Sequence, residues 1–113
     1  MTGLDRAMAT LIGVALGDAV GMPSQTLSRA AIAAGYGRIG GFVDPVAGHP
    51  VSHGLCAGQI TDDTEQTLLL ATRLIADGGS FDEARWAEDL LAWEEGVKVR
   101  GLRDLLGPST KAA

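Results

Sequence analysis

The sequence predicts an all-α fold, and three observations support this prediction. Strand signals are sparse, because no run of alternating β-branched residues is longer than four. Apolar residues recur at helical spacing, as Trp86, Leu90 and Trp93 do at i, i+4 and i+7. Hydrophobic residues make up 46% of the 113 residues but aromatic residues only 4%. The core must therefore consist of small aliphatic side chains, which suit closely packed helices.

The first predicted helix runs from about Leu4 to Val20 and carries an unusual row of glycines. Gly13, Gly17 and Gly21 recur every four residues and therefore lie on one face. Each interior glycine costs a helix about 1 kcal/mol relative to alanine. We expect this face to be bare either because another helix packs very close to it or because a ligand and its loop lie against the backbone.

A second, shorter helix is predicted from a cap at Ser28 through Ala34, with Gly35 ending it. Residues 36–60 are rich in glycine and show no helical period. Long loops inside compact domains are usually functional or disordered, so this loop is a candidate for gating a site.

The third predicted helix begins at the segment GQITDDTE (58–65) and ends at Gly78-Gly79. The fourth follows at once, with Ser80 and Glu83 as a predicted capping box. A last short helical piece is expected over 102–106, and GPSTKAA (107–113) reads as the opening of a further helix.

Composition excludes several classes of function. The net charge is −5 and Lys and Arg form no cluster, so neither a nucleic-acid surface nor an anionic-membrane surface is expected. The apolar stretch 7–16 looks too short to span a bilayer. The single cysteine, Cys56, excludes an internal disulfide and fits a reducing compartment, so a cytoplasmic protein is expected.

Two neighbouring aspartates, Asp62 and Asp63, stand where the third helix begins. One explanation is capping, with Asp62 as the N-cap and Glu65 three residues later. That explanation leaves Asp63 unexplained, since it points about 100° away around the helix. Two carboxylates and the Thr61 hydroxyl are all oxygen donors, which is a suitable set for a hard cation such as Mg²⁺.

Asp18 is an acid in the middle of the apolar first helix. It is either a buried carboxylate bonded to loop amides or a group that contacts a substrate. The sequence leaves both interpretations open.

The segments GVALGDAVGMP (13–23), GQITDDTEQTLLLA (58–71) and GPSTKAA (107–113) together resemble the N-terminal part of the ADP-ribosylglycohydrolase family. Their order and spacing match, and the resemblance covers essentially the whole chain. It implies an all-α fold, hydrolysis of glycosidic bonds to ADP-ribose and two Mg²⁺ ions. It also implies that Thr61, Asp62 and Asp63 are metal ligands.

The resemblance has two departures. The family's C-terminal Asp-x-Asp-Thr metal motif does not occur in this chain. We therefore expect residues 1–113 to be the N-terminal part of one glycohydrolase-like domain, truncated at its C-terminus. Some members also place a glutamate where this chain has Gln25, eight residues after Gly17. Gln25 can orient a substrate but cannot accept a proton.

The function expected from these features is Mg²⁺-dependent hydrolysis of ADP-ribosyl or related ribosyl compounds, or of an ADP-ribosylated protein. Asp62 and Asp63 are the candidate catalytic residues, while Gln25 and Asp18 are the candidate substrate-binding residues. The isolated 113-residue chain is expected to be inactive. The alternative, favoured by Gln25, is a catalytically inactive domain of the same fold that binds ADP-ribose or a nucleotide.

Overall fold

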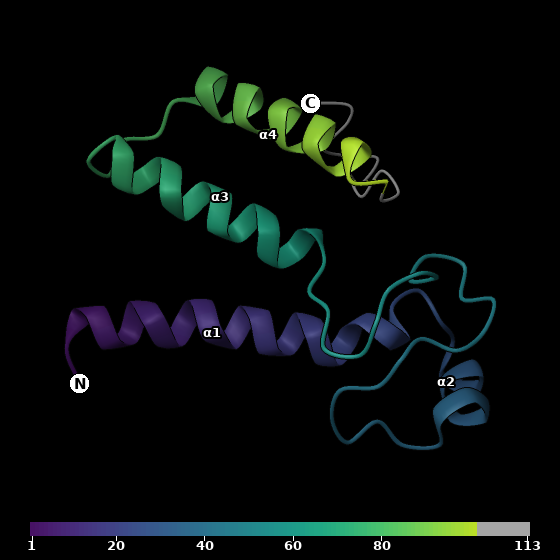
Figure 1. Ribbon diagram of the computed structural model, residues 1–113. Helices are drawn as coiled ribbons and strands as arrows, with labels where there is room; N and C mark the ends of the chain where they lie inside the picture. The colour runs from purple at the N-terminus through teal and green to yellow at the C-terminus, as the bar shows by residue number, and fades with distance from the viewer. Residues whose placement is uncertain (102–113) are drawn as a thin grey trace. The chain divides into compact units, whose positions relative to one another are not determined.

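The computed structural model describes residues 1–101, and all their regular secondary structure is helical (Figure 1). The elements in order are α1 (Gly3–Gly21), the 3₁₀ helix η1 (Met22–Ser24), α2 (Arg29–Tyr36), α3 (Asp62–Ala76) and α4 (Glu83–Val99). The predicted all-α class is confirmed. The helix expected over 102–106 and the segment 107–113 lie outside the described residues. The chain divides into two compact units, with the boundary inside α3 between Thr64 and Glu65.

Helix α1 has the bounds that the sequence predicted, to within a residue at each end. It opens with a capping box in which the Thr2 side chain accepts from the Asp5 amide and the Asp5 carboxylate accepts from the Thr2 amide. The 3₁₀ turn with Pro23 follows directly, and Met22 and Pro23 are buried there. The C-terminal end of α1 therefore lies in the packed part of the first unit.

The helical segment Gly3–Ser24 is long and apolar enough to cross a membrane by length and composition. The expectation that the apolar stretch is too short was therefore wrong, because the helix continues well beyond 7–16 at both ends. Core helices of soluble proteins and signal sequences pass the same test, so this single helix is weak evidence for a membrane span.

Helix α2 starts where predicted but ends later. Ser28 caps it by accepting from the Ala31 amide. Gly35 does not end it: the helix continues to Tyr36, and Gly37 takes the left-handed conformation at φ 66°. A Cβ on Gly35 would come within 2.7 Å of the Val46 side chain, so this glycine allows a close approach instead.

Tyr36 fixes the end of α2 against the rest of the first unit. Its hydroxyl donates to the Pro23 carbonyl at 2.7 Å and accepts from the Val46 amide at 2.8 Å. Residues 37–61 carry neither helix nor strand, and they return to the C-terminal end of α1 (Figure 1). Ala19, Met22, His49, Ser52 and Thr61 are buried at this end. The core of the first unit therefore lies where α1 meets the loop.

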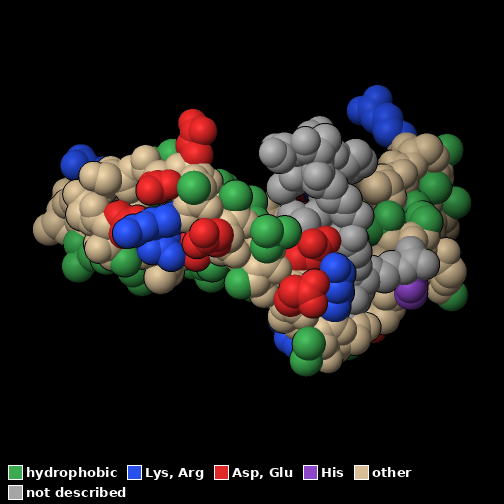
Figure 2. All heavy atoms as spheres, turned by 90° about the horizontal axis from the view of Figure 1, so that it is seen from above, with side chains coloured by type: hydrophobic (Ala, Val, Ile, Leu, Met, Phe, Trp, Pro, Cys, Tyr) green, Lys and Arg blue, Asp and Glu red, His purple; other side chains and the backbone are tan. Residues whose placement is uncertain are grey.

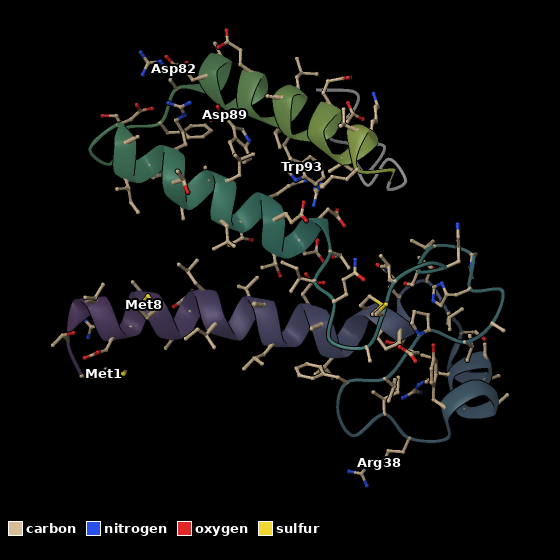
Figure 3. The ribbon with its side chains drawn as sticks, viewed as in Figure 1. Met1, Met8, Arg38, Asp82, Asp89 and Trp93 are labelled. Atoms are coloured by element: carbon tan, nitrogen blue, oxygen red, sulfur yellow. The ribbon has the colours of Figure 1, made fainter. Side chains whose placement is uncertain are left out.

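In the second unit, α3 and α4 lie side by side and are joined by polar contacts. Arg73 of α3 donates two hydrogen bonds to Asp89 of α4, at 2.7 and 2.8 Å. The Trp93 indole donates to Glu65 at 2.7 Å. Figure 3 shows Asp89 and Trp93 extending from α4 towards α3. These contacts fix the pairing of the two helices.

The predicted capping box of Ser80 and Glu83 was wrong. The N-cap of α4 is Asp82, whose carboxylate accepts from the amides of Ala84 and Arg85. An ionised side chain two residues closer to the helix satisfies these amides directly and suits the positive end of the helix dipole. Ser80 is instead part of the turn after Gly78 and Gly79, both of which have positive φ.

On the face that Figure 2 shows, acidic and basic groups of the described residues lie next to one another.

Candidate metal centre

Asp18 ties α1 to the start of α3. Its Oδ2 accepts from the Thr61 amide at 2.7 Å, the Thr64 hydroxyl at 2.6 Å and the Thr64 amide at 3.3 Å. Its Oδ1 accepts from the Thr61 hydroxyl at 2.7 Å. Helix α3 begins at Asp62, so these amides belong to its first turn. A side chain from another helix thus supplies the acceptors that the first turn of α3 requires.

These hydrogen bonds determine the charge of Asp18. Burial raises the pKa of Asp18, but the bonds from Thr61 and Thr64 outweigh burial, so the pKa lies below its ordinary value. Asp18 therefore remains ionised at neutral pH. Thr61 and Thr64 are both buried.

Asp62 is the first residue of α3, so the interpretation of Asp62 as the N-cap was wrong. Thr61, the residue before the helix, takes the N-cap position, since its hydroxyl oxygen accepts from the Asp63 amide at 3.4 Å. The same hydroxyl donates to Asp18. Glu65 accepts from Trp93 and Arg100 in the second unit. The acid pair therefore lies within the first turn and does not precede it.

Asp62 is half-buried, and its surroundings disfavour the ionised form of its carboxylate. Burial and then the charge of Asp63 raise the pKa of Asp62, with a smaller contribution from Asp18, and together they outweigh the hydrogen bonds from its own backbone amide and from Thr61 that lower it. Asp63 is exposed. A cation beside these carboxylates would offset the repulsion between them and favour the ionised form of Asp62.

The Thr61 hydroxyl has its single proton committed to Asp18. A hydroxyl oxygen has two lone pairs, and the long contact from the Asp63 amide engages at most one of them. These two contacts leave one lone pair of the Thr61 oxygen, within a residue that is buried. Thr61, Asp62 and Asp63 form a set of hard oxygen donors of the kind that Mg²⁺ prefers.

This set would supply only part of the ligands of a Mg²⁺ ion. Among residues 1–101, no group of three or more His, Cys, Asp and Glu side chains is placed to hold a metal ion. Mg²⁺ requires near-octahedral coordination, with waters or other oxygens completing the shell. The donors fit the cation in kind, and waters or other oxygens would have to complete its coordination shell.

A cavity of about 310 Å³ in the first unit is lined in part by Asp63, one of the two neighbouring aspartates. Such a volume lies at the lower end of the range for small-molecule sites. Its lining combines two aspartates, an amide side chain and bare helix backbone: Val14, Gly17, Asp18, Gly21, Met22, Gln25 and Asp63. The glycine row of α1 thus leaves backbone open to this cavity at Gly17 and Gly21, while Gly13 is not part of the lining.

The structure therefore brings Asp18, Gln25 and Asp63 together around one cavity, with Thr61 held by Asp18. Their roles remain predictions. Two residues that contribute to this arrangement were missed from the sequence: Thr64, which bonds Asp18, and Ser52, which bonds Gln25 at 2.7 Å. Thr64 belongs to the TDDT segment and could have been suspected. Nothing in the sequence signals Ser52.

His49 organises the loop that carries Ser52. Its Nδ1 accepts from the amides of Val51 and Ser52, at 3.1 and 2.8 Å, so the ring proton is on Nε2. His49 is 2% exposed, and its Nε2 has no partner among the described residues. The His49 ring thus builds a turn within residues 49–52 in which His49 and Ser52 are buried.

Comparison with known proteins identifies a protein family that matches this chain. The family model for ADP-ribosylglycohydrolase matches residues 1–113. The chain is 31% identical to an uncharacterised protein, YegU, of Escherichia coli K12, over 96% of this chain and 32% of that protein. It is 39% identical to ADP-ribosylarginine hydrolase Tri1 of Pseudomonas putida GB-1, over 80% of this chain and 21% of the hydrolase.

A further relative is the ADP-ribosyl-[dinitrogen reductase] glycohydrolase of Rhodospirillum rubrum, 32% identical over 96% of this chain and 37% of that protein. The chain therefore spans between a fifth and two fifths of the length of these relatives. No solved structure matches the chain.

Proposed function

Because the chain belongs to the ADP-ribosylglycohydrolase family, we propose that it contributes the N-terminal part of a Mg²⁺-dependent hydrolase that cleaves the glycosidic bond of ADP-ribosylated substrates. Two of the relatives are named for hydrolysis of ADP-ribosyl groups from arginine or from dinitrogen reductase. The observation that carries the proposal is the set of Asp18 contacts, which fixes Thr61 beside Asp62 and Asp63 at the edge of a cavity.

The proposed ligands of the cation are Thr61, Asp62 and Asp63. Asp18 is proposed to hold the Thr61 hydroxyl in place, because the proton of that hydroxyl is directed at Asp18. Two bound Mg²⁺ ions would orient the ribose hydroxyls and a water and would lower the pKa of that water. Two ions would need more carboxylate ligands than this segment supplies. We propose that these further carboxylates belong to another part of the domain.

The residues of the cavity have distinct proposed roles. Cleavage of the glycosidic bond develops positive charge on the sugar ring. Asp63 lines the cavity and Asp18 stays ionised there, so both carboxylates can stabilise that charge. Gln25 offers an uncharged amide to the same space and can position a substrate hydroxyl. Asp62 and Asp63 remain the candidates for catalysis, because Gln25 cannot accept a proton.

The test is release of ADP-ribose from an ADP-ribosylarginine peptide by the full-length protein, followed by chromatography. Activity is expected with Mg²⁺ and is expected to be lost in excess chelator. Asp62→Asn and Asp63→Asn should each lower turnover by at least about 10-fold. Glu88→Gln is the control, because Glu88 is an exposed acid of α4 in the second unit. Equal turnover in excess chelator contradicts the metal mechanism.

Gln25 supports a second candidate function, a domain that binds ADP-ribose without cleaving it. An amide in the cavity keeps hydrogen-bonding capacity but removes a general base. Calorimetric binding of ADP-ribose with no release from the peptide would favour this candidate. Release that depends on Asp62 and Asp63 would exclude it.

A further inference from the structure

Ser52 is completely buried in the loop and lies between two partners. Its hydroxyl donates to the Met22 carbonyl at 2.8 Å, and the Gln25 amide nitrogen donates to the Ser52 oxygen at 2.7 Å. Its own backbone amide donates to His49 Nδ1. The turn at His49 therefore holds the Ser52 hydroxyl within hydrogen-bonding distance of the Gln25 side chain.

The number of protons at Ser52 determines which end of the Gln25 amide faces it. A serine hydroxyl has one proton, and the Met22 carbonyl is an acceptor that can take only a donor. With that proton committed, the Ser52 oxygen can only accept from Gln25. The amino group of Gln25 must then face Ser52, and its carbonyl oxygen must face away.

Gln25 lines the cavity with Asp18 and Asp63, and no described residue bonds its carbonyl oxygen. We propose that Ser52 is a positioning residue that fixes the amide of Gln25, so that the site presents a neutral acceptor oxygen to a hydroxyl of the substrate ribose. The inference rests on the proposed function for the identity of the ligand. It assigns the ribose-binding role to the pair of residues and not to Gln25 alone.

The same arrangement selects against a carboxylate at position 25. Both oxygens of an ionised glutamate are acceptors, so one of them would face a lone pair of the Ser52 oxygen. The Ser52 hydroxyl could donate to the glutamate only by giving up its hydrogen bond to the Met22 carbonyl. Releasing that carbonyl would remove its shorter hydrogen bond and leave it only the longer one from the Gln25 backbone amide, at 3.3 Å, which is unfavourable. The loop is therefore matched to glutamine.

A double-mutant cycle measured by calorimetric titration of ADP-ribose into the full-length protein tests this role. Ser52→Ala is expected to weaken ADP-ribose binding roughly 10-fold in the wild-type background. In a Gln25→Ala background the same change should have little effect on affinity, because Ser52 acts through Gln25. Ser28→Ala, which removes a serine hydroxyl at the cap of α2, is the control and should leave affinity unchanged.

A merely structural role for Ser52 would give a different pattern. Ser52→Ala would then weaken binding by the same factor with and without Gln25, and that result overturns the proposal. Gln25→Glu is a second variant that leaves Ser52 in place, and it should also weaken binding. Binding by Gln25→Glu as tight as that of the wild type overturns the proposal as well. A wild-type protein that binds no ADP-ribose contradicts the proposed function and the Ser52 role together.

Discussion

The carboxylate of Asp18 accepts four hydrogen bonds from two threonines that follow it by more than forty residues in the chain. Through them one side chain closes the first turn of α3 and fixes the Thr61 hydroxyl. The low pKa of Asp18 follows from the same bonds. At the scale of the residue, the candidate metal centre therefore depends on an acid that need not touch the metal.

Asp18→Asn is expected to lower the free energy of unfolding by about 2 kcal/mol, because an amide nitrogen would face hydroxyl and amide donors. Thr64→Val is the matched control, since it removes one bond to the same carboxylate and leaves Thr61 in place. It should cost about 1 kcal/mol. Urea denaturation measures both changes. Equal stability of Asp18→Asn and the wild type would contradict the role of Asp18 in holding α3.

Magnesium titration of the same two variants distinguishes an effect on stability from an effect on the metal site. Asp18→Asn should weaken Mg²⁺ binding, because the Thr61 hydroxyl loses its fixed orientation. Thr64→Val should leave Mg²⁺ affinity near that of the wild type, despite its loss of stability. Equal weakening in both variants would show that affinity follows stability alone.

The sequence identified the TDDT segment through the repulsion between adjacent acids, and in the structure Asp63 of that segment lines a cavity. It could not assign the partners of Asp18, since hydrogen bonds between distant segments leave no local pattern. The same limit applies to Ser52, which is an ordinary loop serine in the sequence. Its role depends on the turn at His49.

The glycine row of α1 is the main feature at the scale of the element. A Cβ on Gly13, Gly17 or Gly21 would meet no atom within 4 Å. Glycine is therefore not required at these positions by packing among the described residues. Gly17 and Gly21, however, line the cavity.

Gly17→Ala is therefore expected to raise the free energy of unfolding by about 1 kcal/mol through helix propensity, and yet to weaken ADP-ribose binding. Gly13→Ala is the matched control on the same helix, outside the cavity lining. It should stabilise α1 equally and leave binding unchanged. Thermal unfolding and calorimetry give the two readouts. Tighter or unchanged ADP-ribose binding by Gly17→Ala would contradict a ligand lying on this backbone.

The pair of α3 and α4 is expected to lose stability in acid. Hydrogen bonds from Arg73 hold the pKa of Asp89 below its ordinary value. A lowered pKa in the folded state adds stability that is fully present above the ordinary aspartate pKa of about 3.9 and is lost as pH falls through the folded-state pKa. The stability difference between wild type and Asp89→Asn should therefore be constant near neutral pH and shrink in acid. Urea denaturation across this range measures it, and a difference that grows in acid would contradict the assignment.

Helix positions could be predicted more accurately than helix ends. Caps, glycines and apolar spacing together located the four α-helices of residues 1–101, and Ser28 was correctly identified as a cap. The cap of α4 was misassigned because Ser80 and Asp82 both precede the helix and both can cap. The end of α2 was misassigned because Gly35 accommodates Val46, a contact that the sequence does not show.

At the scale of the whole molecule, the chain spans a minor part of its relatives, and within the first unit the described residues leave an apolar face of α1 exposed. This face consists of large side chains spaced by four residues: Leu4, Met8, Ile12, Leu16 and Val20. Among residues 1–101, no three His, Cys, Asp or Glu side chains are grouped so as to hold a metal ion. Both observations support the proposal that the site is completed by a further part of the domain.

Residues 1–113 alone are accordingly expected to bind Mg²⁺ weakly and to release no ADP-ribose from a modified peptide. The chromatographic assay used for the full-length protein checks this directly. Measurable hydrolysis by these residues alone would contradict the shared site.

The most direct test of the central claim is a calorimetric titration of Mg²⁺ into the full-length protein, its Asp62→Asn and Asp63→Asn variants and the variant with both changes. The account predicts saturable binding by the wild type, weakening by at least about 10-fold in each single variant and a further loss in the double variant. Unchanged Mg²⁺ affinity in the double variant would show that these two carboxylates do not hold the ion.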